Sequence, residues 1–356
     1  MKKIVLTGGG TAGHITPNIA LLPELRKRGY DIEYIGSIDG MEKEMIAAEG
    51  VPYHGISTGK LRRYLSARNL TDPFRIIKGY FQARSLLKKI KPDVIFSKGG
   101  YVSVPVVYAA KSLRIPSVIH ESDMTPGLAN KLCFGSASRI CCNFPETLQY
   151  LPEGKSVLTG SPIRQELFTG EKAKGLEYCG FDSSKPVILV IGGSLGSAAI
   201  NKAVRAVLPK LLESFQIIHI CGAGNLNETL TGTPGYRQFE FVREPLKDLM
   251  AAADLVISRA GANVICELLA LRKPNILIPL PTGASRGDQL INAASFKKQG
   301  FSFLLPEEEM TEESLLNAVN TVFADRQSYV SAMEKSGLAD SISVIAGMLD
   351  ELADRN

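Results

Sequence analysis

Three glycines and a histidine near the start of the chain are spaced in a way that can bind phosphate. The segment Ile4 to His14 reads IVLTGGGTAGH, and Gly8, Gly10 and Gly13 follow the G-x-G-x-x-G spacing. An apolar run precedes the glycines, and apolar residues at helical spacing follow them. A strand, a glycine turn and a helix N-terminus present backbone N–H groups and a positive dipole end to an anion. The same spacing also occurs in tight turns that bind no ligand.

His14 stands at the expected start of the helix that follows these glycines. The positive end of a helix dipole lowers the pKa of an imidazole and keeps it neutral, as a general base requires. A capping role, or a bond to a neighbouring loop, is the alternative. His120, which precedes Glu121, is expected to be a packed strand end. The chain contains no H-E-x-x-H metal motif.

Glycine pairs recur after two later apolar runs. The pairs Gly99–Gly100 and Gly192–Gly193 follow the strands expected at 93–96 and 187–191. A dehydrogenase needs one such loop, whereas several loops suit a nucleoside diphosphate donor and an acceptor that also carries phosphate. Asp39, just beyond the second expected strand, keeps a dinucleotide-binding alternative open.

Apolar runs alternate with helical patterns along the whole chain. This alternation implies parallel sheets with helices on both faces. Because two halves each begin with a strand, a glycine loop and a helix, we predict an α/β protein with two Rossmann-like domains facing across a cleft. The predicted domains are 1–160, joined by a C-terminal helix at 338–356, and 161–337. Ligands of such sheets bind at the carboxyl ends of the strands.

Composition limits the class of protein. Of the 356 residues, 45% are hydrophobic and 22% are charged, which is typical of a soluble globular protein. No apolar run reaches the roughly 18 residues of a membrane span, and a signal peptide is not expected. The six cysteines show no C-x-x-C spacing, which argues against a zinc site and for reduced thiols in the cytoplasm. Because the sequence has no D-x-D motif to carry Mg²⁺, helix N-termini and basic side chains must neutralise a diphosphate.

Residues 60–91 differ in charge from the rest of the chain. They contain ten basic residues and one acid, so the remainder is net acidic although the whole chain carries +5. Leu70, Phe74, Ile77 and Phe81 form an apolar stripe at helical spacing among these charges. The segment is either a crossover helix that buries this stripe or a surface that meets anionic lipid headgroups.

Two further side chains have the right chemistry for a nucleotide sugar. Arg164 follows a strand and Pro162, and its guanidinium is a rigid multi-donor for phosphate. Glu267 has a carboxylate that can accept from two vicinal hydroxyls. The alternatives are a surface arginine at a domain junction and a solvated helix face.

Taken together, seven segments occur in the order that is seen in the MurG family of bacterial glycosyltransferases, which the sequence resembles over nearly its whole length. They are IVLTGGGTAGHITP, SKGGYVSVPVVYAA, HESDMTPGLANK, GSPIR, VIGGSLGSAAIN, SRAGANVICEL and DQLINA. The resemblance implies a GT-B fold and an inverting, metal-independent reaction of peptidoglycan synthesis. N-acetylglucosamine (GlcNAc) would pass from UDP-GlcNAc to the C4 hydroxyl of the N-acetylmuramoyl unit of undecaprenyl-linked lipid I, giving lipid II.

The resemblance also implies roles for individual residues. His14 would be the catalytic base or would orient the acceptor hydroxyl. The N-terminal domain would bind the acceptor through Gly9, Thr11, Ala12, Gly13, Gly99, Gly100, Tyr101 and Asp123. The C-terminal domain would bind UDP-GlcNAc through Gly193, Ser194, Leu195, Gly196, Arg259, Gly261, Glu267, Asp288 and Gln289, together with Arg164. No metal and no cofactor are expected.

The implied partners are UDP-GlcNAc, an undecaprenyl-diphosphate-linked acceptor, an anionic membrane surface and cell-wall synthesis proteins, with no nucleic acid. The implied location is the cytoplasmic face of the cell membrane, where the protein would be peripheral. Ala12, Asp123, Leu195 and Asp288 differ from the residues usual in the family. Three alternatives stay open: a related glycolipid glycosyltransferase or paralogue with another acceptor, an NAD-dependent dehydrogenase, and a non-catalytic membrane scaffold.

Overall fold

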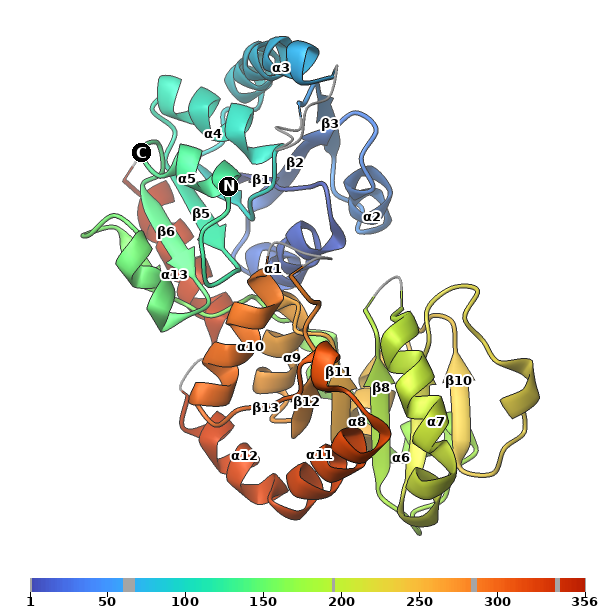
Figure 1. The fold of residues 1–356 in the computed structure, drawn as a ribbon. Coiled ribbons are helices and arrows are strands. Elements are labelled where there is room, and N and C mark those ends of the chain that lie inside the picture. The colour runs from blue at the N-terminus through green and yellow to red at the C-terminus, as the bar shows by residue number, and fades with distance from the viewer. Residues whose placement is uncertain (1, 60–67, 194–195, 283–286, 337–339, 356) are drawn as a thin grey trace. The chain divides into compact units, whose positions relative to one another are not determined.

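The computed structural model describes residues 2–59, 68–193, 196–282, 287–336 and 340–355. The chain divides into two compact units. Unit 1 consists of residues 1–164 and 338–356, and unit 2 consists of residues 165–337. Each unit has its own parallel sheet, which confirms the expected α/β class (Figure 1).

Unit 1 is built on a parallel sheet with the order β3-β2-β1-β4-β5-β6-β7. Its strands are β1 (Lys3–Thr7), β2 (Asp31–Ser37), β3 (Tyr53–Ile56), β4 (Val94–Ser97), β5 (Ser117–Glu121), β6 (Arg139–Cys142) and β7 (Ser156–Leu158). Its helices are η1 (Ala12–His14), α1 (Thr16–Lys27), α2 (Glu42–Ala48), α3 (Arg68–Ile90), α4 (Ser103–Ser112), α5 (Leu128–Cys133), η2 (Pro145–Tyr150) and α13 (Ser341–Ala353). Strands β1, β4, β5 and β6 are almost wholly buried, as inner strands of parallel sheets are, whereas β3 and β7 at the two ends of the sheet are partly exposed.

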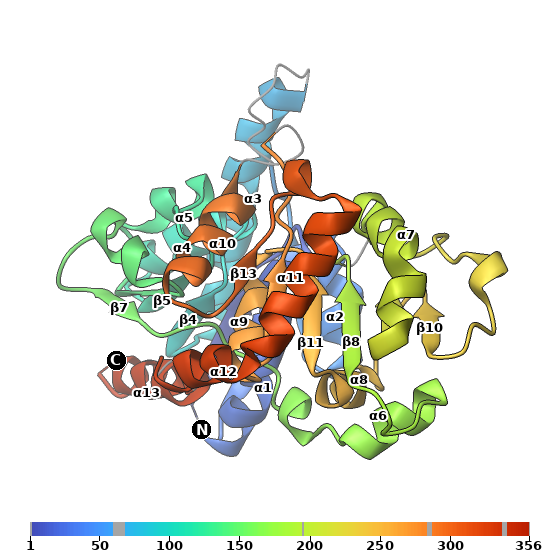
Figure 2. The same ribbon diagram turned by 60° about the horizontal axis from the view of Figure 1, so that its bottom comes forward.

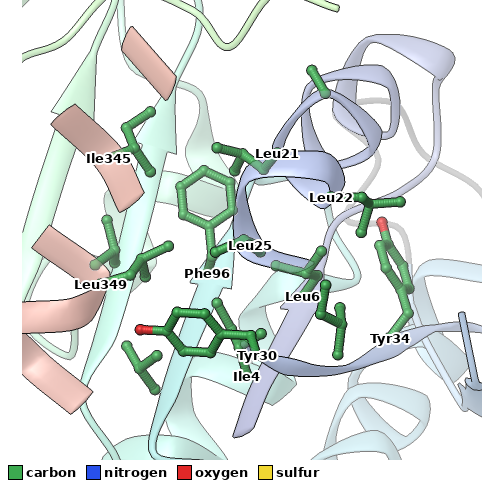
Figure 3. Close-up of a cluster of buried hydrophobic side chains, with 14 of the residues drawn as sticks. Ile4, Leu6, Leu21, Leu22, Leu25, Tyr30, Tyr34, Phe96, Ile345 and Leu349 are labelled. Carbon is green, nitrogen blue, oxygen red and sulfur yellow. The ribbon is translucent and has the colours of Figure 1, made fainter. Parts of the chain in front are cut away.

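Helix α13 belongs to the core of unit 1 although it ends the chain. Its Ile345 and Leu349 pack with Leu25, Phe96 and other side chains of α1, β1 and β4 (Figure 3). Asp350 of the same helix accepts hydrogen bonds from Lys2, Arg28 and Tyr30. Helix α13 therefore packs on the N-terminal sheet through its apolar face, and the hydrogen bonds of Asp350 hold the helix at the edge of this contact.

Unit 2 repeats the plan with the strand order β10-β9-β8-β11-β12-β13. Its strands are β8 (Val187–Ile191), β9 (Gln216–Ile220), β10 (Tyr236–Phe239), β11 (Leu255–Ser258), β12 (Asn275–Leu277) and β13 (Phe303–Leu304). Its helices are η3 (Gln165–Thr169), α6 (Lys172–Cys179), α7 (Ala198–Ser214), η4 (Glu228–Leu230), α8 (Leu246–Ala252), α9 (Ala262–Ala270), α10 (Asp288–Lys298), η5 (Glu307–Glu309), α11 (Glu312–Ala324) and α12 (Arg326–Glu334).

Helix α3 buries a different face from its apolar stripe. Phe74, Ile77 and Phe81 are exposed to 74%, 55% and 63%, whereas Ala83 and Leu87 pack into the core. Figure 2 shows α3 reaching beyond the other elements of its unit. The structure therefore excludes the alternative in which α3 buries these three side chains. Leu70 lies outside the residues whose side chains are described.

Candidate functional site

The glycine loops that follow β1 and β8 lie where the chain changes the side on which it adds strands to each sheet. From β1 the chain proceeds to β2 and β3 on one side, then returns to β4 on the other side of β1. In unit 2, β8 and β11 have the same relationship. In open parallel sheets, ligands bind at the carboxyl ends of the two strands that flank such a switch point. Each unit therefore offers one candidate binding edge.

In unit 1 the first two glycine loops are in contact. Thr7 and Ser97, the last residues of β1 and β4, are register partners. Gly100 has a φ of +83°, and a Cβ added there would lie 2.3 Å from the carbonyl oxygen of Gly9 and 3.3 Å from Nδ1 of His14. Only glycine fits both this conformation and this space. The structure thus brings together the predicted acceptor residues of both loops.

His14 is the last residue of η1 and lies beside the second loop. Its Nδ1 is 3.0 Å from Oγ1 of Thr11, so the hydroxyl fixes the ring. If Nδ1 carries the proton and donates to Thr11, Nε2 keeps its lone pair and can accept a proton. Ala12 and Gly13 form the rest of this short helix, so they determine the backbone that orients the imidazole.

A buried carboxyl group, which the sequence analysis missed, lies against the first loop. Glu42, the first residue of α2, is fully buried and accepts from the backbone N–H and the hydroxyl of Ser37. The N–H of Gly10 points to its Oε2 at 3.5 Å. Burial raises the pKa of Tyr101, and Coulombic repulsion from Glu42 adds to this shift. At least one amide of the predicted acceptor loop is therefore directed at a carboxyl group of the protein.

The loop after β5 is held by Glu121. This carboxyl group, 4% exposed, accepts from the backbone N–H groups of Asp123 and Gly127 and from the side chain of Asn130. Burial raises the pKa of Glu121. Asp123, a predicted acceptor residue, therefore sits in a loop that is braced by its neighbour, at the same sheet edge as the two glycine loops.

The third glycine loop leads into α7 in unit 2. The N–H of Gly196 donates to the carbonyl of Gly193 at 3.0 Å. Gly196 has a φ of +76°, and a Cβ there would lie 2.0 Å from the carbonyl oxygen of Cys221. Ser197 caps α7 by accepting from the N–H of Ile200. The predicted donor residues Ser194 and Leu195 lie outside the described residues.

Arg259 follows β11 and connects this loop to the rest of unit 2. Its guanidinium, 8% exposed as a residue, donates to Oγ of Ser197 at 2.7 Å and to the carbonyls of Ile278 and Pro279. It also forms an ion pair with Glu307, whose Oε2 is 2.5 Å from Nη2. The donor role that the resemblance implies for Arg259 stays a prediction, and in the structure these contacts hold the start of α7.

The other predicted donor residues occupy separate places. Gly261 is the N-cap of α9, and Glu267 lies half-buried on that helix. Asp288 and Gln289 begin α10, where Oε1 of Gln289 accepts from the N–H of Leu280 at 3.1 Å. Arg164 is the last residue of unit 1 before the chain enters unit 2.

Lys98 is a second group that sequence reasoning missed. It lies between the end of β4 and the glycine pair, is 1% exposed, and places its ammonium 2.7 Å from Nδ1 of His120. A lysine directly after an apolar strand was the available signal. The sequence offered no such signal for Glu42, because an acidic residue at the start of a helix is common.

Two features are absent from the part of the chain that the structure describes. Among the described residues, no group of three or more histidine, cysteine or acidic side chains is arranged to hold a metal ion. None of the helices in that part of the chain is both long and apolar enough to cross a bilayer.

We expect two buried histidines to make both units sensitive to mild acid. Burial and the charge of Lys98 hold the pKa of His120 well below its usual 6.5. Burial, with Arg205 nearby, lowers the pKa of His219 to about 3. The unfolded chain therefore binds more protons than the folded chain below pH 6.5. Stability present above that pH is lost as the pH falls, by about 2 kcal/mol per histidine on reaching pH 5.

Urea unfolding of the full chain at pH 7 and pH 5, followed by probes in each unit, measures this effect. His219→Asn should flatten the pH dependence of unit 2 and leave that of unit 1 unchanged. If the stability of unit 2 depends on pH equally in the wild type and in this variant, the effect does not come from His219.

Comparison with known proteins gives the family. The models of the glycosyltransferase family 28 N-terminal and C-terminal domains match residues 4–141 and 187–345. The chain is 62% identical, over 99% of both chains, to the UDP-N-acetylglucosamine–N-acetylmuramyl-(pentapeptide) pyrophosphoryl-undecaprenol N-acetylglucosamine transferase of Lachnospira eligens. It is 58% identical, with the same coverage, to the transferase of that name from Lachnoclostridium phytofermentans. The crystal structure of MurG from Acinetobacter baumannii superposes with a TM-score of 0.77 at 25% identity, covering 99% of this chain and 100% of that one.

Proposed function

Because this chain belongs to glycosyltransferase family 28, we propose that it transfers GlcNAc from UDP-GlcNAc to the C4 hydroxyl of N-acetylmuramic acid in undecaprenyl-diphosphate-linked lipid I. The product is lipid II, a precursor of peptidoglycan. The observation that carries this proposal is the 62% identity, over 99% of both chains, to a transferase of that name. The transfer inverts the anomeric centre and uses no metal ion.

On the acceptor side, the reacting hydroxyl lies near His14. The imidazole is fixed by Thr11 at 3.0 Å and neighbours the Gly99–Gly100 turn. With Nδ1–H directed at Thr11, Nε2 takes the proton of the C4 hydroxyl as that oxygen attacks the anomeric carbon. Direct attack in a single displacement gives inversion.

On the donor side, the UDP diphosphate lies at the turn that precedes α7. The backbone N–H groups there and the positive end of a 17-residue helix stabilise the charge that develops on the leaving UDP. Glu267 accepts from the ribose hydroxyls, and Gln289 presents its amide N–H₂ to the sugar because its carbonyl is held by Leu280. Since the sequence has no D-x-D motif, this neutralisation replaces a metal ion.

The test is transfer of labelled GlcNAc from UDP-GlcNAc to a short-chain lipid I analogue by the full chain, with and without EDTA. We expect equal rates in both conditions and a β-linked product by NMR. No product in either condition overturns the proposed function. Loss of activity in EDTA that Mg²⁺ restores overturns only the metal independence. An acceptor with its C4 hydroxyl removed is the control.

We further propose that the protein works at the cytoplasmic face of the membrane, bound peripherally through α3. We define the α3 patch as Phe74, Ile77 and Phe81, exposed to 74%, 55% and 63%. Arg75 and Lys78 are exposed beside them on the same helix. Apolar side chains insert at the headgroup boundary, while each basic residue near an anionic surface adds about 1 kcal/mol.

Replacing all three patch residues with serine should lower binding to vesicles that contain phosphatidylglycerol at least tenfold. Full burial of one such apolar side chain contributes about 1.5–3 kcal/mol, and the serine variants lose this contribution. Thermal stability should not change, because the side chains are exposed. Vesicle co-sedimentation measures the binding. Phe168→Ser, at an exposed phenylalanine of unit 2, is the matched control. Unchanged binding of the triple variant would exclude α3 as the membrane contact.

A further inference from the structure

A groove in unit 2 lies between helix α7 and the loop that follows β9. We define the α7 groove by the residues that line it, which are Ala198, Asn201, Lys202, Arg205, Ala206 and Asn225. Its volume of about 500 Å³ lies within the range of small-molecule sites in proteins. The proposed UDP turn precedes the same helix, but a Cβ on Gly196 of that turn would lie 2.0 Å from the carbonyl oxygen of Cys221, which directly follows β9. Packed backbone therefore separates the turn from the groove at this point.

Two cationic side chains line the α7 groove without an acidic partner. Lys202 is exposed and Arg205 is half-buried. They are three residues apart on α7, so they are neighbours on the surface of the helix. Neither of them forms an ion pair with a residue that the structure describes. Like charges at this spacing repel each other, so the side chains of the protein leave a positive charge here that an anion would neutralise.

The guanidinium of Arg205 is held in place by neutral groups. Its Nη2 donates to the carbonyl of Asn225 at 2.6 Å and to Oε1 of Gln238 at 3.2 Å, and it lies 3.4 Å from Sγ of Cys221. Its Nε is buried without a hydrogen-bond partner among the described residues, so the protein does not use all the donors of this side chain. A guanidinium stays protonated in proteins. These contacts therefore fix the position of a full positive charge before any ligand binds.

A buried network holds Asn201, another residue of the groove. Its Nδ2 donates to the carbonyl of Cys221 at 2.9 Å, and its Oδ1 lies 2.9 Å from Nε2 of His219. Nδ1 of His219 lies 2.9 Å from the hydroxyl of Tyr236. Burial, with the charge of Arg205 nearby, lowers the pKa of His219 to about 3, so at neutral pH the ring is uncharged and donates to Asn201 through Nε2. The groove thus rests on a fixed network that carries no charge of its own.

The lining of the α7 groove limits the class of ligand. None of the described residues that line it carries a carboxyl group, and Glu240 near the same loop accepts from the N–H of Gly224 at 2.6 Å. A guanidinium presents several donors in a rigid fork, and an ammonium adds a point charge, so the pair suits a phosphate group. The side-chain amide of Asn225 donates one bond to the carbonyl of Ala223 and keeps a donor and an acceptor for hydroxyl groups. A small phosphate with hydroxyl groups therefore fits both the charge and the volume.

We propose that the α7 groove is a binding site for a small phosphate ester, such as a sugar phosphate, whose phosphate group is held by Arg205 and Lys202. The ligand contacts the β9 side of α7, whereas the proposed UDP site lies at the turn after β8. The site goes beyond the proposed transfer reaction and does not depend on it. The chain is expected to bind UDP and the phosphate ester at the same time.

The test is calorimetric titration of the full chain with ribose 5-phosphate and, separately, with inorganic phosphate, each with and without saturating UDP. We expect one saturable site for both probes, and UDP should displace neither. Ribose 5-phosphate should bind more tightly than inorganic phosphate, because its sugar also contacts the groove.

Variants of the two cations identify the site. Arg205→Met should lower the affinity for both probes by about tenfold to a hundredfold, the range for hydrogen bonds that involve a charged group. Arg205→Lys should keep part of that affinity, since it retains the charge but not the planar fork. Lys202→Met should lower the affinity several-fold, and Lys202→Glu should lower it further because it places a carboxylate beside the phosphate.

A matched control separates this role from a general effect of charge. Lys210→Met removes another exposed lysine of α7, one that does not line the groove, and should leave the affinity for both probes unchanged. The affinity for UDP should stay the same in the Lys202 and Lys210 variants. Thermal unfolding reports whether Arg205→Met folds. If it does not, the variants of the exposed Lys202 decide the question.

Four outcomes overturn the inference: no saturable binding of either probe, displacement of the probes by UDP, equal losses of affinity in Lys202→Met and Lys210→Met, or wild-type affinity in Lys202→Glu. Binding of inorganic phosphate without ribose 5-phosphate also overturns it, because the site then takes the ion and not an ester. A chain that binds both probes through Lys202 and Arg205 but transfers no GlcNAc keeps this site and loses the proposed function.

Discussion

Replacing His14 with alanine is expected to lower kcat for GlcNAc transfer by between about 10² and 10⁴, the range for loss of a general base. The affinity for UDP should not change, because His14 belongs to unit 1 and the proposed nucleotide residues Glu267 and Gln289 belong to unit 2. Initial rates at saturating donor and acceptor measure kcat, and calorimetry measures the binding of UDP.

A second variant tests how the imidazole of His14 is oriented. Thr11→Val removes the oxygen that lies 3.0 Å from Nδ1 and keeps the shape of the side chain. The ring then loses this hydrogen bond, so kcat should fall about tenfold, less than in His14→Ala. His54→Ala is the control. This histidine, on β3, pairs with Glu33 through Nε2 at 2.5 Å, and its loss should leave kcat unchanged.

Two results would contradict the assignment of His14 as base. An undiminished kcat in His14→Ala would move the base to another group. A loss of kcat that His14→Gln restores would show that the side chain orients the acceptor by a hydrogen bond and takes no proton.

The repeated strand–turn–helix units of the fold could be predicted from the sequence because each unit depends on neighbouring residues in the chain. Apolar runs that end in glycine predict a strand and a turn wherever they occur, and both units use this pattern at β1 and β8. His120, which the sequence analysis expected at a packed strand end, is fully buried near the end of β5.

The side chains that sequence reasoning missed depend on strand order. Lys98 reaches His120 because β4 and β5 are neighbours, and Glu42 reaches Gly10 because the loop after β1 meets the helix after β2. Helix α3 shows a related limit. Its periodicity identified the stripe of Phe74, Ile77 and Phe81 but not which face packs, and the close approach of Gly79 to Ser57 fixes that face instead.

Arg259 makes buried contacts within unit 2 that its residue type did not predict. A guanidinium suits a phosphate, and the family resemblance implied that Arg259 binds the donor. In the structure its donors are directed at Ser197, Ile278, Pro279 and Glu307. Its contribution to UDP binding should therefore come through the conformation of the loop before α7.

We accordingly expect Arg259→Met to destabilise unit 2 by up to about 3 kcal/mol, the lower end of the cost of breaking a buried ion pair, because the side chain of Glu307 is 24% exposed. The variant leaves Glu307, two carbonyls and the α7 cap without the guanidinium. Urea unfolding with a probe in unit 2 measures the change, and calorimetry should show weaker binding of UDP in the same variant. Arg259→Lys should rescue only part of the loss, since an ammonium cannot donate in a planar fork.

Arg272→Met is the matched control, because it breaks another arginine–glutamate pair of unit 2 that lies in solvent. Arg272 and Glu334 are 55% and 46% exposed, and pairs of this kind contribute about 0–1 kcal/mol. Equal destabilisation by the two variants would contradict the bracing role. If Arg259→Met keeps wild-type stability but loses UDP affinity, the guanidinium binds the donor directly, and the contacts to Ser197 and Glu307 are exchanged for a phosphate when UDP is bound. Stability and affinity falling together would instead show that the loop needs its brace before it can receive the nucleotide.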